Sequence, residues 1–479
     1  MDKLLQYFPF ISIEASLGAL IVGLLAIDLL ASKQISERII PKISLGGLLL
    51  IFFLEIPFLW EKDGILFQHA YILDKFALFF KAFFLLSGFF LIGICRQYQK
   101  RLEAGTNAFF ILLMTTLLGA CCLVSAYNFL AFFISIELMT ISLYILTAYL
   151  KSDSRSTEAG VKYLVMGAFS SAIMLYGISF IYGITGSLSF EKVSSAIQAM
   201  PHLNFLLAAG FFLLIAGIGF KISAFPFQLW VPDVYEGAPT PITAFLSVVS
   251  KAAGFAVLLR ILFSVMGQSL GAMWTTLAAL LAAATLLYGN LGALPQVQGN
   301  IKRLLGFSSI GHAGYLLMGV ASGSALGASA ILYYLTAYGL ANLTIFFVVV
   351  SASDRNESIE SLRGLFSRSP ILGASIFVAV LSLAGVPPLA GFFGKFLIIQ
   401  AVVEKKMLWL AFVGAINIVI SLYYYLMIVK TVYVDKSDGS PIHVSPSARW
   451  SLITLTALII LLGVFQEPLL NLIQQAISL

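Results

Sequence analysis

The sequence predicts an all-α polytopic membrane protein with about 14 transmembrane helices. Hydrophobic residues make up 60% of the 479 positions and charged residues only 10%, which excludes a soluble globular protein. Apolar runs of roughly 18 to 28 residues, long enough to cross a bilayer as helices, recur along the whole chain. No polar segment between them is long enough for a soluble domain, so we expect any activity to lie in the membrane or in partner proteins.

The predicted helices follow one another with short connections. They lie at residues 11–31, 41–60, 74–95, 107–125, 128–150, 159–184, 203–231, 240–266, 271–294, 299–321, 327–351, 371–403, 407–433 and 450–472. We expect the first to be a transmembrane helix and not a signal peptide, because the N-terminus lacks a basic start and a small-residue cleavage site.

The fourth to eighth predicted helices and the ninth to thirteenth resemble two copies of one unit. The fourth helix of each copy is interrupted by glycine and proline, namely by Gly217, Gly219 and Pro226 and by Pro387, Pro388, Gly391 and Gly394. An odd number of helices per copy makes the second run upside down relative to the first. We therefore divide the chain into three N-terminal helices (1–105), repeat 1 (106–268), repeat 2 (269–434) and a C-terminal helix (435–479).

The candidate functional residues are ionisable side chains inside the predicted helices: Glu137, Lys221, Lys251, His312 and Lys395. A charge at the centre of a transmembrane helix costs at least about 2.5 kcal/mol, so such a residue is a functional candidate by default. Lys221 and Lys395 lie at the two interruptions, 174 positions apart, and Glu137 and His312 are separated by 175. The shared offset supports the division into two units.

Each candidate also has a plainer interpretation. Glu137 is either a structural carboxylate or the partner that sets the proton affinity of Lys221. Lys251 and Lys395 have no expected acid at their depth other than Glu137, which favours titrating lysines along a hydrated path over isolated salt bridges. His312 is either a satisfied core side chain or a proton relay.

Other polar residues leave alternatives open. We expect Asp28, Glu55 and Lys81, which lie nearer helix ends, to be solvated or interfacial. Tyr423–Tyr425 belong either to an aromatic belt or to a polar path. The acidic segment 232–236 suits a turn cap or a contact with a neighbouring subunit.

Loop charges predict the orientation of the chain. About 17 Lys and Arg fall on one side of the predicted helices and about eight on the other, and the richer side is expected to face the cell interior. Both termini are then expected outside. The three cysteines, Cys95, Cys121 and Cys122, form no Cys-x-x-Cys pair, so we predict no metal and no redox centre in this chain.

Five stretches carry a resemblance to a known family. They are IEL at 136–138, FKISAFPFQLWVPDVYEGAP at 220–239, SKAA at 250–253, KRLLGFSSIGH at 302–312 and AGVPPLAGFFGK at 384–395. The chain resembles the antiporter-like proton-pumping subunits of respiratory complex I, which are related to Mrp cation/proton antiporters. Asp-Val-Tyr followed by Ser-Lys points to the N type (subunit 2 in mitochondrial naming). Gln228 departs from the pattern, since many relatives have histidine there, and this puts a proton-relay role at that position in doubt.

The resemblance implies a function for the candidate residues. Glu137 and Lys221 would form a pair, Lys251 a central site and Lys395 an exit site in a hydrophilic axis for proton translocation. We expect the proton to pass His312 on its way from Lys251 to Lys395. The subunit would belong to a proton-translocating NADH:quinone oxidoreductase of the bacterial inner membrane, with both termini on the periplasmic side.

The resemblance also implies where the redox chemistry takes place. NADH, FMN, iron–sulfur clusters and quinone would be bound by other subunits, and this chain would hold no cofactor. Its partners would be M-type and K-type membrane subunits and lipids, and no nucleic acid. The alternatives are an Mrp-type cation/proton antiporter subunit and a non-transporting membrane scaffold.

Overall fold

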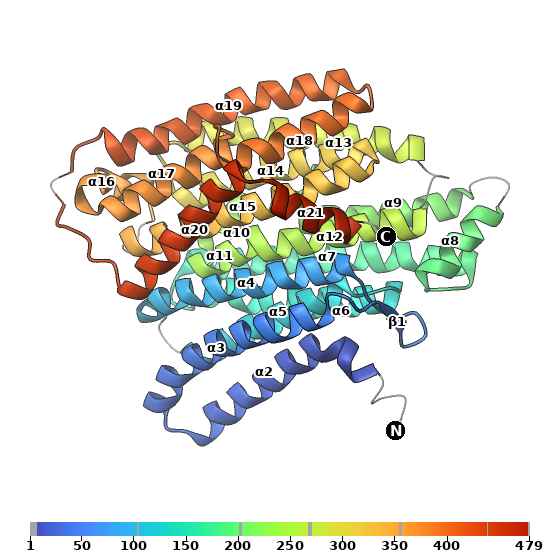
Figure 1. Cartoon of the computed structure of the whole chain (residues 1–479), viewed down its shortest axis with the longest axis horizontal. Coiled ribbons are helices and arrows are strands. Elements are labelled where there is room, and N and C mark those ends of the chain that lie inside the picture. Colours follow the sequence, from blue (N-terminus) through green and yellow to red (C-terminus); the bar gives the residue numbers. More distant parts are fainter. Residues whose placement is uncertain are drawn as a thin grey trace.

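The computed structural model describes residues 7–102, 105–200, 204–266, 271–353, 357–437 and 439–477. Lys3 and Arg355, two of the basic residues counted for the orientation, lie outside these ranges. The described part is a bundle of long helices that run roughly alongside one another (Figure 1). Thirteen of its helical spans are long and apolar enough to cross a membrane. The predicted all-α membrane fold is therefore confirmed.

The N-terminal part consists of three long helices and a small hairpin. Its elements are η1 (Phe8–Ile11), α2 (Ser12–Leu30), α3 (Lys33–Leu59), β1 (Gly64–Leu66), β2 (Tyr71–Leu73), α4 (Lys75–Tyr98) and η2 (Gln99–Arg101). The two strands are antiparallel, with Ile65 opposite Ile72. The sequence does not predict this hairpin.

The next part carries the first broken helix. Its elements are α5 (Thr106–Val124), α6 (Phe129–Thr147), α7 (Ser154–Thr185), α8 (Phe190–Ala199), α9 (Phe205–Ile222), α10 (Val231–Gly237), α11 (Thr240–Phe245) and α12 (Lys251–Ile261). Wide π-helical turns, η3 (Leu246–Ser250) and η4 (Leu262–Met266), precede and follow α12. Every residue from Thr240 to Ile261 is buried, so this helix is the centre of the bundle.

The last part carries the second broken helix. Its elements are α13 (Gly271–Ala293), η5 (Leu294–Gln296), α14 (Ile301–Ser322), α15 (Ala325–Ala352), η6 (Ile359–Leu362), α16 (Leu365–Arg368), α17 (Pro370–Ala384), α18 (Ala390–Glu404), α19 (Leu408–Tyr433), α20 (Pro446–Val464) and α21 (Glu467–Ile477). The predicted run 371–403 is thus two consecutive helices, α17 and α18.

The two ends of the bundle differ in their loops. We call the end with the α2–α3 connection, α16 and the α19–α20 connection the basic face, and the end with β1–β2 and α8 the hairpin face; they lie at the left and right of Figure 1. The chain leaves α21 toward the hairpin face, where Trp60 Nε1, at the end of α3, donates a hydrogen bond to Gln475 Oε1 over 3.2 Å.

Both helix interruptions exist, but the glycines do not make the first one. Helix α9 runs through Gly217 and Gly219 and ends only at Ile222, where Ser223 adopts a left-handed conformation with φ 65°. A Cβ at Gly217 would lie 2.6 Å from Met174 Cβ of α7, so this glycine serves close helix packing. The predicted position of the break was therefore wrong by several residues.

The second break lies between Ala384 and Ala390. Helix α17 ends at Gly385, which has φ 88°, and the chain passes Pro387 and Pro388 before α18 begins. Gly391 and Gly394 lie inside α18 and not in the interruption. A Cβ at Gly394 would lie 2.6 Å from Tyr334 Cδ2, so it too allows close packing.

Candidate functional site

Lys221 lies in the last turn of α9, directly before the first break. Its side chain is buried, and Nζ donates a hydrogen bond to Thr140 Oγ1 of α6 over 2.6 Å. The rings of Tyr144 and Tyr163 each lie 5.8 Å from Nζ. The free carbonyl groups at the C-terminal end of a helix favour a cation there, so the break itself helps to hold this ammonium group.

Glu137 lies one turn before Thr140 on α6. Its Oε1 accepts a hydrogen bond from Ser171 Oγ of α7 over 2.5 Å. Glu137 and Lys221 form no ion pair among the described residues, so the predicted pairing of the two, which stays a prediction, does not involve a direct contact in this structure. Residues three apart on a helix are neighbours, so Thr140, which contacts Lys221, also places the carboxylate close by.

Lys251 begins α12, immediately after the π-helical turn η3. Its Nζ donates hydrogen bonds to the backbone oxygen and to Oγ of Ser309 on α14, both over 2.5 Å. Tyr235 OH of α10 lies 3.2 Å from the same Oγ. A Cβ at Gly254, one turn further along α12, would lie 3.7 Å from Lys221 Cβ. Helices α9 and α12, which carry Lys221 and Lys251, therefore pack against each other, and Lys221 meets α12 about one turn beyond Lys251.

His312 lies one turn beyond Ser309 on α14 and is buried. Its Nδ1 is 2.5 Å from Tyr334 OH and its Nε2 is 2.8 Å from Tyr425 OH. Tyr425 OH is also 2.5 Å from Ser308 Oγ. With both ring nitrogens bonded to hydroxyl groups, the histidine joins three helices through atoms that each donate or accept a proton.

The structure decides the alternatives for the tyrosine triplet. Successive residues on a helix point in different directions, and here Tyr423 is exposed whereas Tyr424 and Tyr425 are buried. Tyr424 OH donates to Asn290 Oδ1 over 2.9 Å. Two of the three tyrosines thus belong to the polar interior.

Lys395 lies inside α18, but its side chain reaches back across the second break. Nζ donates to the carbonyl oxygens of Leu383 and Ala384, the last two residues of α17, over 2.8 and 3.1 Å. The ring of Tyr315, one turn beyond His312, lies 4.9 Å from Nζ. Lys221 and Lys395 therefore both place an ammonium group at the C-terminal end of the first half of a broken helix.

Three lysines of this set share one kind of surrounding. Within the described residues, Lys221, Lys251 and Lys395 bond only to hydroxyl and carbonyl oxygens and form no ion pair. Helix α14 contacts two of them, because Ser309 binds Lys251 and the ring of Tyr315, about two turns further along, lies 4.9 Å from Lys395 Nζ. Lys251, His312 and Lys395 thus lie along α14, and Lys221 lies near the half-buried Glu137 on neighbouring helices. The sequence did not predict the hydroxyl groups that contact these residues.

Lys81 corrects the expectation of an interfacial position. It is fully buried in α4 and forms an ion pair with Glu14 of α2, with Nζ 2.6 Å from Oε1. Tyr71 OH, on β2, accepts from Lys81 over 2.8 Å and donates to Glu14 Oε2 over 3.0 Å. The sequence held a signal for this pair: Glu14 and Lys81 have opposite charges and lie early in two predicted helices that begin on the same side of the membrane.

The acidic segment 232–236 forms helix α10 and makes contacts within the chain. Asp233 binds Lys162 and Arg303 over 2.6 and 2.7 Å, and Glu236 binds Arg303 over 2.9 Å. Lys162 belongs to α7 and Arg303 to α14. These pairs hold the half-helix after the first break between the two predicted repeats.

Comparison with known proteins identifies the family. The family described as NADH:quinone oxidoreductase/Mrp antiporter, transmembrane, matches residues 126–421. The chain belongs to this family. A protein of Heliobacterium modesticaldum named NADH-quinone oxidoreductase subunit N is 40% identical over 467 residues, covering 96% of this chain and 97% of the relative.

Solved structures of the family share the fold over nearly the whole chain. A chain of respiratory complex I from Thermus thermophilus is 31% identical with a TM-score of 0.83, covering 96% of this chain and 98% of that one. A chain of the Mrp complex from Dietzia sp. DQ12-45-1b has the same TM-score of 0.83 at 18% identity, covering 98% and 96%, which shows a common fold. The site residues lie within the segment that defines the family.

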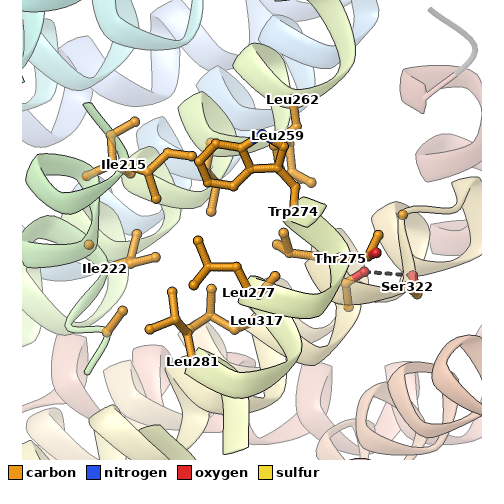
Figure 2. Close-up of a pocket in the computed structure, with 18 of the residues that line it drawn as sticks. Ile215, Ile222, Leu259, Leu262, Trp274, Thr275, Leu277, Leu281, Leu317 and Ser322 are labelled. Carbon is orange, nitrogen blue, oxygen red and sulfur yellow. Dashed lines mark hydrogen bonds between the residues drawn. The ribbon is translucent and has the colours of Figure 1, made fainter. Parts of the chain in front are cut away.

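A large cavity of this family member lies beside the line of lysines and does not include it. Its volume is about 840 Å³, and its walls come from α9, α12, α13 and α14. Figure 2 shows Ile215, Ile222, Leu281 and Leu317 around it, with Trp274 on another side.

Gln228, in the first break, is buried, and its Oε1 has no hydrogen-bond partner among the described residues. The described residues contain no group of His, Cys, Asp and Glu that could hold a metal ion.

Proposed function

We propose that this chain is the N-type proton-translocating subunit of a membrane-bound NADH:quinone oxidoreductase. Protons move along the line Glu137, Lys221, Lys251, His312 and Lys395. Electron transfer from NADH through FMN and iron–sulfur clusters to quinone takes place in other subunits, so this chain carries no redox centre of its own. Family membership and the relative named subunit N support this assignment.

One observation carries the proposal. Three buried lysines have oxygen partners but no carboxylate partner among the described residues. A lysine in a permanent salt bridge is held in its charged form, whereas one held by hydroxyl and carbonyl groups is switched more easily by a charge that approaches or withdraws. Moving one proton against 100 mV needs about 2.3 kcal/mol, and a change of one pKa unit corresponds to about 1.36 kcal/mol. A change of about two units per cycle is therefore sufficient.

The orientation and partners follow from charge and family. The basic face is the cytoplasmic one, since positive loops remain inside, which makes the chain a multi-pass protein of a bacterial inner membrane with both termini outside. Its neighbours are M-type and K-type subunits of the membrane arm, together with lipids.

The test uses the purified native assembly in sealed vesicles. NADH-driven quinone reduction and proton movement are measured together, with wild-type protein and with Lys251→Met, which keeps the length of the side chain and removes its charge. We expect the variant to assemble and to lose most of its proton movement. Full proton movement in an assembled Lys251→Met complex would exclude the proposal.

An Mrp-type cation/proton antiporter subunit is the second candidate, because the same fold occurs in an Mrp complex. An antiporter would exchange protons for sodium ions without NADH. Sodium-driven proton movement in the purified assembly, in the absence of NADH and quinone, would favour this alternative. A scaffold without transport would show neither activity.

A further inference from the structure

A second buried ion pair lies at the basic face, above the helix that carries Lys251. Lys302 Nζ is 2.5 Å from Glu357 Oε2 and donates to the backbone oxygen of Ala238 over 2.7 Å. Thr240, the first residue of α11, donates a hydrogen bond to Glu357 Oε1. The two charged side chains are only 4% and 9% exposed. A carboxylate is thus held at the rim of the bundle in direct contact with a hydroxyl that begins the central helix.

Buried hydroxyl groups continue from this carboxylate toward Lys251. Thr240, Thr243 and Ser247 precede Lys251 by steps of three or four residues, which places all of them on one side of the helix. Each is at most 1% exposed. Side chains at this spacing are neighbours about 5–6 Å apart, a separation that one water molecule bridges. The stripe covers the 12 residues from Thr240 to Lys251, whose 11 steps make about 16 Å of helix.

Two further features lie along this stripe. The helix widens into the π-helical turn η3, Leu246–Ser250, next to Lys251, and such turns frequently mark functional sites. In addition, Thr243 Oγ1 donates to the backbone oxygen of Tyr235 over 3.0 Å, and Tyr235 OH reaches Ser309, which binds Lys251. Polar groups therefore reach Lys251 from the basic face along two neighbouring helices.

The geometry points to Glu357 as the proton-uptake group of Lys251, a role that rests on the proposed function. Water at the basic face gives a proton to Glu357 Oε1, where an O–H bond forms. That proton passes to the hydroxyl oxygen of Thr240 as Thr240 releases its own proton to a bridging water molecule. The same exchange through Thr243, Ser247 and the water molecules between them ends with a new N–H bond on neutral Lys251. Lys302 keeps its charge and positions the carboxylate. One proton leaves the water, one arrives at Lys251, and no electron moves.

The first test compares two buried Lys–Glu pairs of the same chain in the reconstituted assembly. Glu357→Gln removes the titrating group of the uptake path, and Glu14→Gln makes the same change in the pair with Lys81 outside it. We expect Glu357→Gln to slow proton uptake by about 100-fold, the low end of what a positioned proton-transfer group contributes. Glu14→Gln should pump as the wild type does, and Glu357→Asp should recover much of the loss. A small weak acid added on the basic side should also restore uptake in Glu357→Gln.

The second test leaves the ion pair intact and decides the case if Glu357→Gln fails to assemble. Thr243→Val and Ser247→Ala remove hydroxyl groups of the stripe. Thr116→Val removes a buried hydroxyl outside the stripe, on α5, which bonds Leu113 O much as Ser247 bonds Ala244 O. Reduced pumping in the first two with normal pumping in the third is the expected result. Wild-type pumping in Thr243→Val and Ser247→Ala would overturn the path. If Lys251→Met abolishes pumping while these variants pump normally, the uptake path alone is wrong; if Lys251→Met also pumps, the proposed function is wrong.

Discussion

Hydroxyl groups and backbone carbonyl groups together hold the buried lysines. Thr140 binds Lys221, Ser309 binds Lys251 and carbonyl groups of α17 bind Lys395. The five charged positions could be predicted from sequence because a charge within a membrane helix is costly and therefore rare. Their partners could not be predicted, because Ser, Thr and Tyr occur throughout the chain and only packing selects which of them meet a lysine.

The carboxylate of Glu137 is the first group to test. It lies one turn from Thr140, so a negative charge there acts on Lys221 through space and not through a direct bond. We expect Glu137→Asp to retain much more proton movement than Glu137→Gln, because only aspartate keeps the charge. Equal proton movement by the two assembled variants, measured in vesicles during NADH oxidation, would contradict this coupling.

Lys221→Arg tests whether this position must release its proton. The ordinary pKa of arginine exceeds that of lysine by about two units or more, so the guanidinium has about 100-fold less tendency to deprotonate. We expect an assembled Lys221→Arg complex with strongly reduced pumping. Normal pumping would show that a fixed positive charge is sufficient at this position.

The two broken helices show how far local sequence determines an element. The prolines predicted that the helices would be interrupted after α9 and after α17, and the structure confirms both interruptions. The glycines did not mark the boundaries of the two breaks. Gly217 and Gly394 lie inside continuous helices and make room for Met174 and Tyr334. A glycine in a membrane helix is as often a packing site as a break, and only the neighbouring helix distinguishes the two.

Gly385 is the glycine that the second break does require. Its φ of 88° is strained for a residue with a side chain, and a Cβ there would lie 3.0 Å from Lys395 Cδ. We expect Gly385→Ala to cost about 1–2 kcal/mol in stability and to lower pumping by displacing Lys395. Thermal unfolding of the assembly checks the first effect. Gly18→Ala is the matched control, because a Cβ at Gly18 meets nothing within 4 Å.

Within the whole bundle, the two broken helices differ in where their lysine lies relative to the break. The ammonium groups of both lysines lie at C-terminal ends of half-helices, yet Lys221 precedes its break in the chain and Lys395 follows its own. The division of the chain into two five-helix units stays a prediction. The connection of α2 to the core through Glu14 and Lys81 was not predicted, because an ion pair across two helices depends on how they pack.

Inversion of the two units predicts separate access for water. A structure of the assembly with ordered waters should show polar access to Lys221 and Lys251 from the basic face and to Lys395 from the hairpin face. Alternation between the two keeps a proton from leaking straight through. A continuous column of water from one face to all three lysines would contradict this arrangement.

The short halves of the second broken helix also bear on how the protein is made. Helices α17 and α18 contain 15 residues each, or about 22 Å, which is less than the roughly 30 Å of hydrocarbon that a lone helix must cross. Neither half alone spans the hydrocarbon core, so we expect residues 370–404 to be inserted into the bilayer as a single segment. The carbonyl groups of Leu383 and Ala384 at the end of α17 accept hydrogen bonds from Lys395, so the lysine proposed to carry protons also satisfies the backbone at the break.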